Sequence, residues 1–147
     1  PKSALERVIV SRAFTAYQLS ALVLETLEAA LKHYKSKLVL ISDIISLFLD
    51  QDVPTREAVE IFNKIMFHLA DLATKRSIIV AVTCSNGERS KRLVLLESTL
   101  FGRASTTVQV IESRGRLQLA IQNHCFPEPL TIAFSGNEST LEKLVEA

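Results

Sequence analysis

Two stretches decide the fold: Lys37–Asp43 reads KLVLISD, and Ser77–Thr83 reads SIIVAVT. Each is a nearly continuous apolar run, which is typical of a central strand that a parallel sheet buries on both faces. Between them, Asp50–Thr55 (DQDVPT) contains a proline and a plausible helix cap, and apolar residues then recur at helical spacing from Val59 to Leu72. This order of strand, helix and strand predicts a right-handed crossover and a parallel α/β sheet.

The segments on either side extend this pattern. Arg7–Ser11 (RVIVS) predicts a further strand, and the spacing of apolar residues from Phe14 to Tyr34 predicts an amphipathic helix.

Towards the C-terminus, Thr106–Glu112 and Arg116–Gln122 alternate between polar and apolar residues on either side of a Ser-Arg-Gly turn. We therefore expect an antiparallel hairpin there. A short strand at 130–134 (LTIAF) and a weak helix at 139–145 complete the predicted elements.

The composition favours a single domain over residues 1–147. The chain is 48% hydrophobic and 22% charged, and its formal net charge is +1, so no strong overall field would draw it to nucleic acid or anionic lipid. Its apolar runs fall far short of the roughly 20 residues that a membrane span needs. The N-terminus lacks an apolar signal stretch, and Cys84 and Cys125 make no disulfide framework. We expect a soluble, intracellular protein, either cytoplasmic or nuclear.

Asp43 is the first candidate for chemistry, because it ends a predicted parallel strand where open α/β sheets form their ligand crevice. Such an acid could bind Mg²⁺ next to nucleotide phosphates; its structural alternative is a helix cap or turn. The phosphate loop GxxxxGK[ST] is absent from a chain with four glycines. The three histidines and two cysteines have no metal-site or triad spacing. We therefore expect no cofactor in isolation, and ATP with Mg²⁺ only if another chain or segment supplies a Walker A loop.

The densest basic cluster follows the strand predicted at Ser77–Thr83. Arg89, Lys91 and Arg92 lie there, and Arg103 could add to the same face. These cations could bind DNA phosphates, or they could form a solvated helix start. The apolar run Leu93–Leu96 that follows predicts a helix, and it is the alternative candidate for a packing or partner surface.

Several short motifs resemble the ATPase core of the RecA/RadA recombinases, in the archaeal and eukaryotic strand-exchange branch. Their order and spacing cover most of the chain. The matching segments are Ser11–Phe14 (SRAF), Leu38–Asp43 at the Walker B strand, Ala70-Asp71, Val80–Thr83, Ala104–Thr107 (ASTT), Arg114–Arg116 and Cys125–Glu128 (CFPE).

The resemblance implies a RecA-like, mostly parallel sheet flanked by helices, without the N-terminal phosphate-loop portion. It implies a nucleotide site made of Asp43, Ser85, Gln122 and Pro127, in which Pro127 belongs to the segment that caps ATP on a neighbouring protomer. The chain departs from the family's pattern at three places. Ser85 replaces the glutamine that senses the nucleotide in the family, and Gln122 replaces an aspartate. At the position of the family's second DNA-binding loop, this chain has the basic cluster and the predicted helix that follows it.

These departures favour a non-catalytic recombinase paralog, or the C-terminal part of one, that acts as a binding or regulatory module in DNA recombination or repair. Its expected partners are a recombinase or paralog protein, with DNA and a second copy of the chain as further candidates. One alternative is half of a composite ATPase, in which Asp43 binds Mg²⁺. Another is a homo-oligomeric interaction domain that does not bind nucleic acid.

Overall fold

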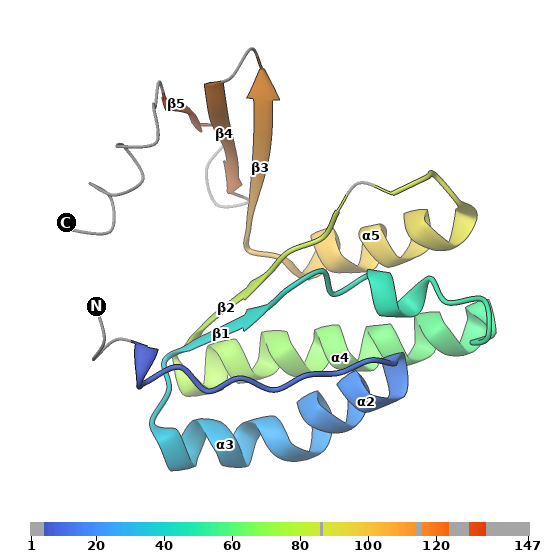
Figure 1. Cartoon of the computed structure of the whole chain (residues 1–147), viewed down its shortest axis with the longest axis vertical. Helices are drawn as coiled ribbons and strands as arrows, with labels where there is room; N and C mark the ends of the chain where they lie inside the picture. The colour runs from blue at the N-terminus through green and yellow to red at the C-terminus, as the bar shows by residue number, and fades with distance from the viewer. Residues whose placement is uncertain (1–4, 86, 114–115, 124–129, 135–147) are drawn as a thin grey trace. The chain divides into compact units, whose positions relative to one another are not determined.

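The computed structural model describes residues 5–85, 87–113, 116–123 and 130–134. Its contacts divide the chain into two compact units, Pro1–Arg103 and Ala104–Ala147 (Figure 1). Both helices and strands are present, so the mixed α/β class is confirmed. The first unit contains α2 (Ala16–Ala21), a π-helical turn η1 (Leu22–Thr26), α3 (Leu27–Tyr34), β1 (Leu38–Ile41), a 3-10 turn η2 (Ser46–Phe48), α4 (Thr55–Arg76), β2 (Ile79–Val82) and α5 (Lys91–Arg103).

The helix predicted from Phe14 to Tyr34 is confirmed as the continuous run α2, η1 and α3. Thr15 caps its start, because its hydroxyl accepts a hydrogen bond from the Gln18 backbone N–H at 3.2 Å. Within the π turn, the Thr26 hydroxyl donates to the Leu22 carbonyl at 2.8 Å. The run ends at Lys35, whose φ of 52° is a left-handed helix cap.

The strands β1 and β2 pair in parallel, as the sequence predicts. Their register aligns Leu38 with Ile79 and Ile41 with Val82. The long helix α4 connects them, which is the crossover connection that a parallel pair requires. Figure 1 shows α4 running along this strand pair. The structure therefore contains a parallel β–α–β unit whose sheet, among the described residues, has two strands.

The prediction that both strands are buried on two faces is wrong. Leu38, Leu40 and Ile79 are 52%, 72% and 67% exposed, whereas Val39 and Ile41 pack against the core. The buried side chains of the helices join the core on the Val39 and Ile41 side of the sheet. One face of the strand pair is therefore covered, and the other carries apolar side chains in contact with solvent.

The strand predicted at Arg7–Ser11 is also wrong. Arg7 lies in a turn, residues 8–11 form no regular secondary structure, and in the described part of the chain none of them pairs with a strand. Ile9 and Val10 instead line a hollow of about 600 Å³ together with residues 38–41 and with side chains of α2, η1 and α3. β-branched residues favour extended backbone, but a strand also needs a neighbour for its N–H and C=O groups.

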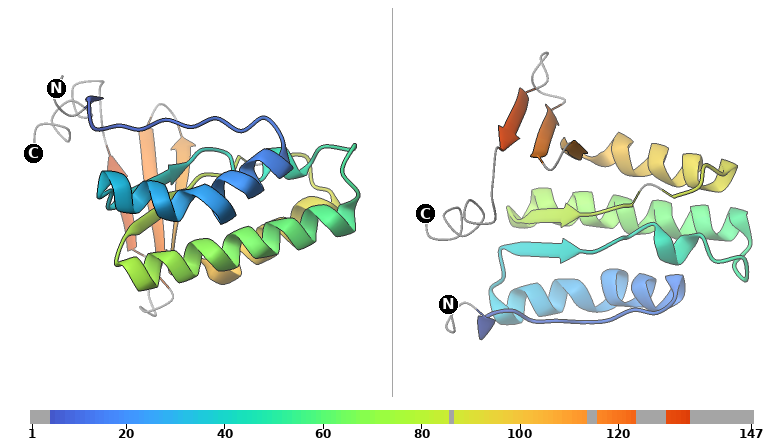
Figure 2. Two further views of the ribbon diagram at one scale, coloured as in Figure 1. Left: turned by 90° about the horizontal axis from the view of Figure 1, so that it is seen from below. Right: turned by 45° about the horizontal axis from the view of Figure 1, so that its top comes forward.

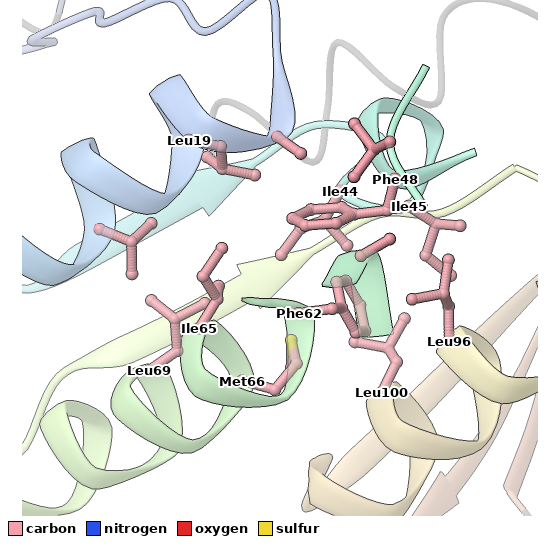
Figure 3. Packing of buried hydrophobic residues seen from close by; sticks show 14 of the residues in the cluster. Leu19, Ile44, Ile45, Phe48, Phe62, Ile65, Met66, Leu69, Leu96 and Leu100 are labelled. Carbon is pink, nitrogen blue, oxygen red and sulfur yellow. The ribbon is translucent and has the colours of Figure 1, made fainter. Parts of the chain in front are cut away.

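The core of the first unit consists of a large apolar cluster and a second, smaller one of Leu31, Leu72 and Ile78, both packed against the covered sheet face. Phe48 and Phe62 are fully buried and meet edge to face, with ring centroids 5.0 Å apart. Figure 3 shows them among side chains from α2, α4 and α5. Three leucines of α5 complete the cluster: Leu93, Leu96 and Leu100. The helix predicted after the basic cluster is therefore present and packed by one face, with α5 alongside α4 (Figure 2).

The second unit confirms the predicted hairpin. β3 (Thr106–Ser113) and β4 (Arg116–Asn123) pair antiparallel over their whole length, from Thr106 opposite Asn123 to Ser113 opposite Arg116. β5 (Leu130–Phe134), also predicted, pairs antiparallel with β4. The helix expected at 139–145 lies outside the described residues.

Candidate functional site

Two of the predicted nucleotide-site residues lie together at the carboxyl ends of β1 and β2. The Asp43 Oδ1 accepts a hydrogen bond from the Ser85 hydroxyl at 3.1 Å and a longer one from the Ser85 backbone N–H at 3.4 Å. Parallel pairing produces this meeting, because the chain leaves both strands at the same edge of the sheet. The sequence thus located two members of one polar cluster.

The backbone around Asp43 is tied to the end of β2. The Asp43 N–H donates to the Thr83 hydroxyl at 2.9 Å, and the Ile44 N–H donates to the Thr83 carbonyl at 2.9 Å. The Asp43 carbonyl in turn accepts from the Ser46 hydroxyl at 2.9 Å. Asp43 has a φ of 48°, a left-handed conformation that aspartate tolerates better than most residues. These bonds give Asp43 a clear structural role as the residue that turns the chain out of β1.

Cys84 lies between the two residues that bond to Asp43. Burial raises the pKa of its thiol above the ordinary value, and the carboxylates of Glu97 and Asp43 raise it further. A thiol in this setting stays protonated, which does not favour a nucleophile. Among the described residues, no group of three His, Cys, Asp or Glu side chains comes together to hold a metal ion.

The structure does not test the other two predicted nucleotide-site residues, Gln122 and Pro127. Gln122 lies in β4, where its backbone is paired with Thr107. Pro127 lies outside the described residues. The nucleotide site therefore remains a prediction for Gln122 and Pro127.

The predicted basic cluster separates into cations with different surroundings. Lys91 is the first residue of α5 and Arg89 lies two residues before it, and both are exposed. Arg92 is half-buried, and its Nη1 donates to the Val53 carbonyl at 2.9 Å. Its Nε and Nη2 are buried without a hydrogen-bond partner among the described residues. Arg92 therefore holds the loop before α4, and its guanidinium is not available to an outside phosphate in this arrangement.

Arg103 lies at the opposite end of α5. Its guanidinium carbon is 5.2 Å from the centroid of the Phe67 ring on α4, a cation–π distance. A helix of 13 residues is about 20 Å long, so Arg103 does not extend the cluster formed by Arg89 and Lys91.

Sequence reasoning missed two contributors to these sites. Thr83 links both strand ends, yet a threonine at a strand end carries no distinctive signal. The apolar run Leu93–Leu96 divides between two environments: Leu93 and Leu96 are buried, whereas Val94 and Leu95 are 48% and 50% exposed. The helical phase of the buried leucines could have predicted this division.

No protein-family model matches the chain, and a search of curated proteins finds no match. Within the ranges that the structure describes, no helix is both long and apolar enough to cross a membrane.

Proposed function

We propose that this chain is a non-catalytic, RecA-like binding module that acts in DNA recombination or repair by engaging a recombinase or paralog protein. The observation that carries the non-catalytic part is the engagement of Asp43 by Ser85. The residue expected to bind Mg²⁺ has a structural task at the end of β1. The 147 residues also supply no phosphate loop that could anchor a nucleotide next to it.

Two observations support the RecA-like scaffold. The order of short motifs along the sequence matches that of the recombinase core, as described above. The parallel pair β1–β2 with its connecting helix α4 is the repeating unit of such a sheet. One face of the β1–β2 sheet exposes apolar side chains to solvent. Such a face is suited to binding the surface of another protein.

Titration calorimetry with Mg-ATP tests the non-catalytic proposal on the full chain. We expect no saturable heat up to about 1 mM nucleotide, which corresponds to a binding free energy weaker than about −4 kcal/mol. The matched variant is Asp43→Asn, because asparagine keeps the Oδ1 acceptor and tolerates the left-handed backbone but removes the charge that attracts Mg²⁺. Micromolar binding by the parent chain that is lost in Asp43→Asn would overturn the proposal.

A composite ATPase is the second candidate. It is favoured by the position of Asp43 at the carboxyl ends of two adjacent parallel strands, and by its Oδ2, which accepts no hydrogen bond from the described residues. A partner chain with a Walker A loop would then complete the site. Phosphate release by the mixture, abolished in Asp43→Asn, would replace the first proposal by this one.

DNA is the competing partner for the exposed cations Arg89 and Lys91. Each phosphate contact steepens a log–log plot of affinity against salt by about 0.7 for a single strand. Since Arg92 is bonded to Val53, two contacts are the most that this cluster offers, and replacing Arg89 and Lys91 would flatten the slope by up to about 1.4.

A further inference from the structure

Helix α5 has two apolar faces, of which the core uses one. Leu93, Leu96 and Leu100 are at most 3% exposed. On the other side, Val94, Leu95 and Phe101 are 48%, 50% and 40% exposed. Val94, Ser98 and Phe101 follow one another at the spacing of one helix face, with Leu95 next to them. We call Val94, Leu95, Ser98 and Phe101 the outer stripe.

Basic side chains border one end of the outer stripe. A shallow hollow, open to solvent over most of its extent, is lined by two cations and two apolar residues of the stripe, together with Ser90: Arg89, Ser90, Lys91, Val94 and Leu95. Within the described residues, neither Arg89 nor Lys91 takes part in a salt bridge. The hollow therefore combines apolar walls with two available positive charges.

We propose that the outer stripe binds a segment of a partner protein in which apolar side chains are followed by acidic ones. An apolar side chain of the segment would enter the hollow against Val94 and Leu95. Its carboxylates would then meet Arg89 and Lys91, where charge complementarity fixes the orientation of the segment. This inference rests on the proposed function and names the chemistry of its partner.

The composition of the hollow favours a protein segment over DNA. Base stacking uses aromatic side chains, and the hollow is lined by none. Val94 and Leu95 would gain little from a sugar–phosphate backbone, whereas burial of each against an apolar partner side chain removes apolar area from water. The nearby Arg92, a third cation for phosphate, is bonded to Val53.

Fluorescence anisotropy of a labelled peptide tests the proposal with the full chain. The probe is a peptide of about three helical turns composed of Leu, Phe, Asp and Glu, and its matched control has Lys in place of every acid. We expect saturable binding of the acidic peptide that weakens with added salt. The pairs Val94→Ser with Leu95→Ser, and Arg89→Ala with Lys91→Ala, should each reduce affinity by roughly fivefold or more. Arg103→Ala, at the other end of α5, should leave it unchanged.

Three results would overturn the proposal: no binding of the acidic peptide, equal binding of the lysine peptide, or full affinity in the Val94 and Leu95 variant. Binding of an oligo-dT strand that requires Arg89 and Lys91 but not Val94 and Leu95 would assign the surface to DNA instead. Circular dichroism checks that the variants fold, and the single variants Val94→Ser and Leu95→Ser replace the pair if it does not. The Mg-ATP titration is a separate measurement, so failure of the docking proposal is distinguishable from failure of the non-catalytic proposal.

Discussion

The hydroxyl of Ser85 donates a hydrogen bond at 3.1 Å to the Oδ1 of Asp43, a residue 42 positions earlier in the sequence, and so joins the ends of two parallel strands. The same loop is held by the bond from the Asp43 N–H to the Thr83 hydroxyl. Both residues were expected to contact a nucleotide, and here they contact each other. The stability of the loop therefore depends on the side chain that the resemblance would assign to Mg²⁺.

Asp43→Ala should destabilise the chain by about 2 kcal/mol. Roughly half of this comes from the hydrogen bonds that Ser85 loses, and the rest from placing alanine at a φ of 48°. Asp43→Asn should stay within about 0.5 kcal/mol of the parent, because asparagine keeps an acceptor and adopts the left-handed region. Urea denaturation measures the free energy of unfolding of both variants. Equal stability of the alanine and asparagine variants would contradict the structural role of Asp43.

Arg92→Ala should cost about 1–2 kcal/mol in the free energy of unfolding, because the Val53 carbonyl loses its partner and the arginine stem loses its packing. Arg89→Ala is the matched control on the same segment, and we expect it to change stability by less than about 0.5 kcal/mol. Arg92→Met should be less harmful than Arg92→Ala, since methionine keeps the stem volume and removes the buried Nε and Nη2, which have no hydrogen-bond partner among the described residues. If all three variants unfold at the same urea concentration, Arg92 is a surface cation after all.

The thiol of Cys84 should be alkylated slowly. Its raised pKa leaves a smaller thiolate fraction at a given pH, so the rate of reaction with iodoacetamide should rise at higher pH than that of a small exposed thiol such as glutathione. Asp43→Asn removes one of the two carboxylates that raise the pKa and should move the rate profile partly back; burial, the larger cause, is unchanged. Mass spectrometry of a Cys125→Ser chain follows Cys84 alone. A profile identical to that of glutathione would contradict the raised pKa.

Local patterns predicted the elements and their pairing well. The helix-spaced apolar residues before Tyr34 and after Pro54, the two apolar strands and the alternating hairpin all carry signals within a few residues of one another. The structure confirms α4, the parallel pairing of β1 with β2 and the antiparallel hairpin. The periodicity of apolar residues predicts the type of each element. The length of the connection then predicts the pairing, because a short turn joins antiparallel strands and a long helical connection joins parallel ones.

What the sequence could not predict depends on neighbours that are distant in the chain. Arg89, Lys91 and Arg92 are three neighbouring cations in the sequence, and only the fold shows that the Arg92 Nη1 donates to the carbonyl of Val53, 39 residues away. Likewise, a strand made of apolar residues is able to be buried on both faces. Its sequence does not show whether helices pack on one face of the sheet or on both. The strand predicted at Arg7–Ser11 did not form, because a β-branched run shows that a segment favours a strand without showing that a neighbouring strand pairs with it.

The final prediction concerns the exposed and the buried face of β1. Leu40 and Ile41 are adjacent in β1, with Leu40 72% exposed and Ile41 packed against the core. Leu40→Ser should change the free energy of unfolding by less than about 0.5 kcal/mol, because its side chain is already in water. Ile41→Ser should cost about 2–3 kcal/mol, since it removes buried apolar area and introduces a hydroxyl facing the core. Urea denaturation of the two variants compares the faces directly on one strand. A loss in Leu40→Ser as large as that in Ile41→Ser would mean that a further layer covers the Leu40 face, and the strand pair would then be buried on both sides.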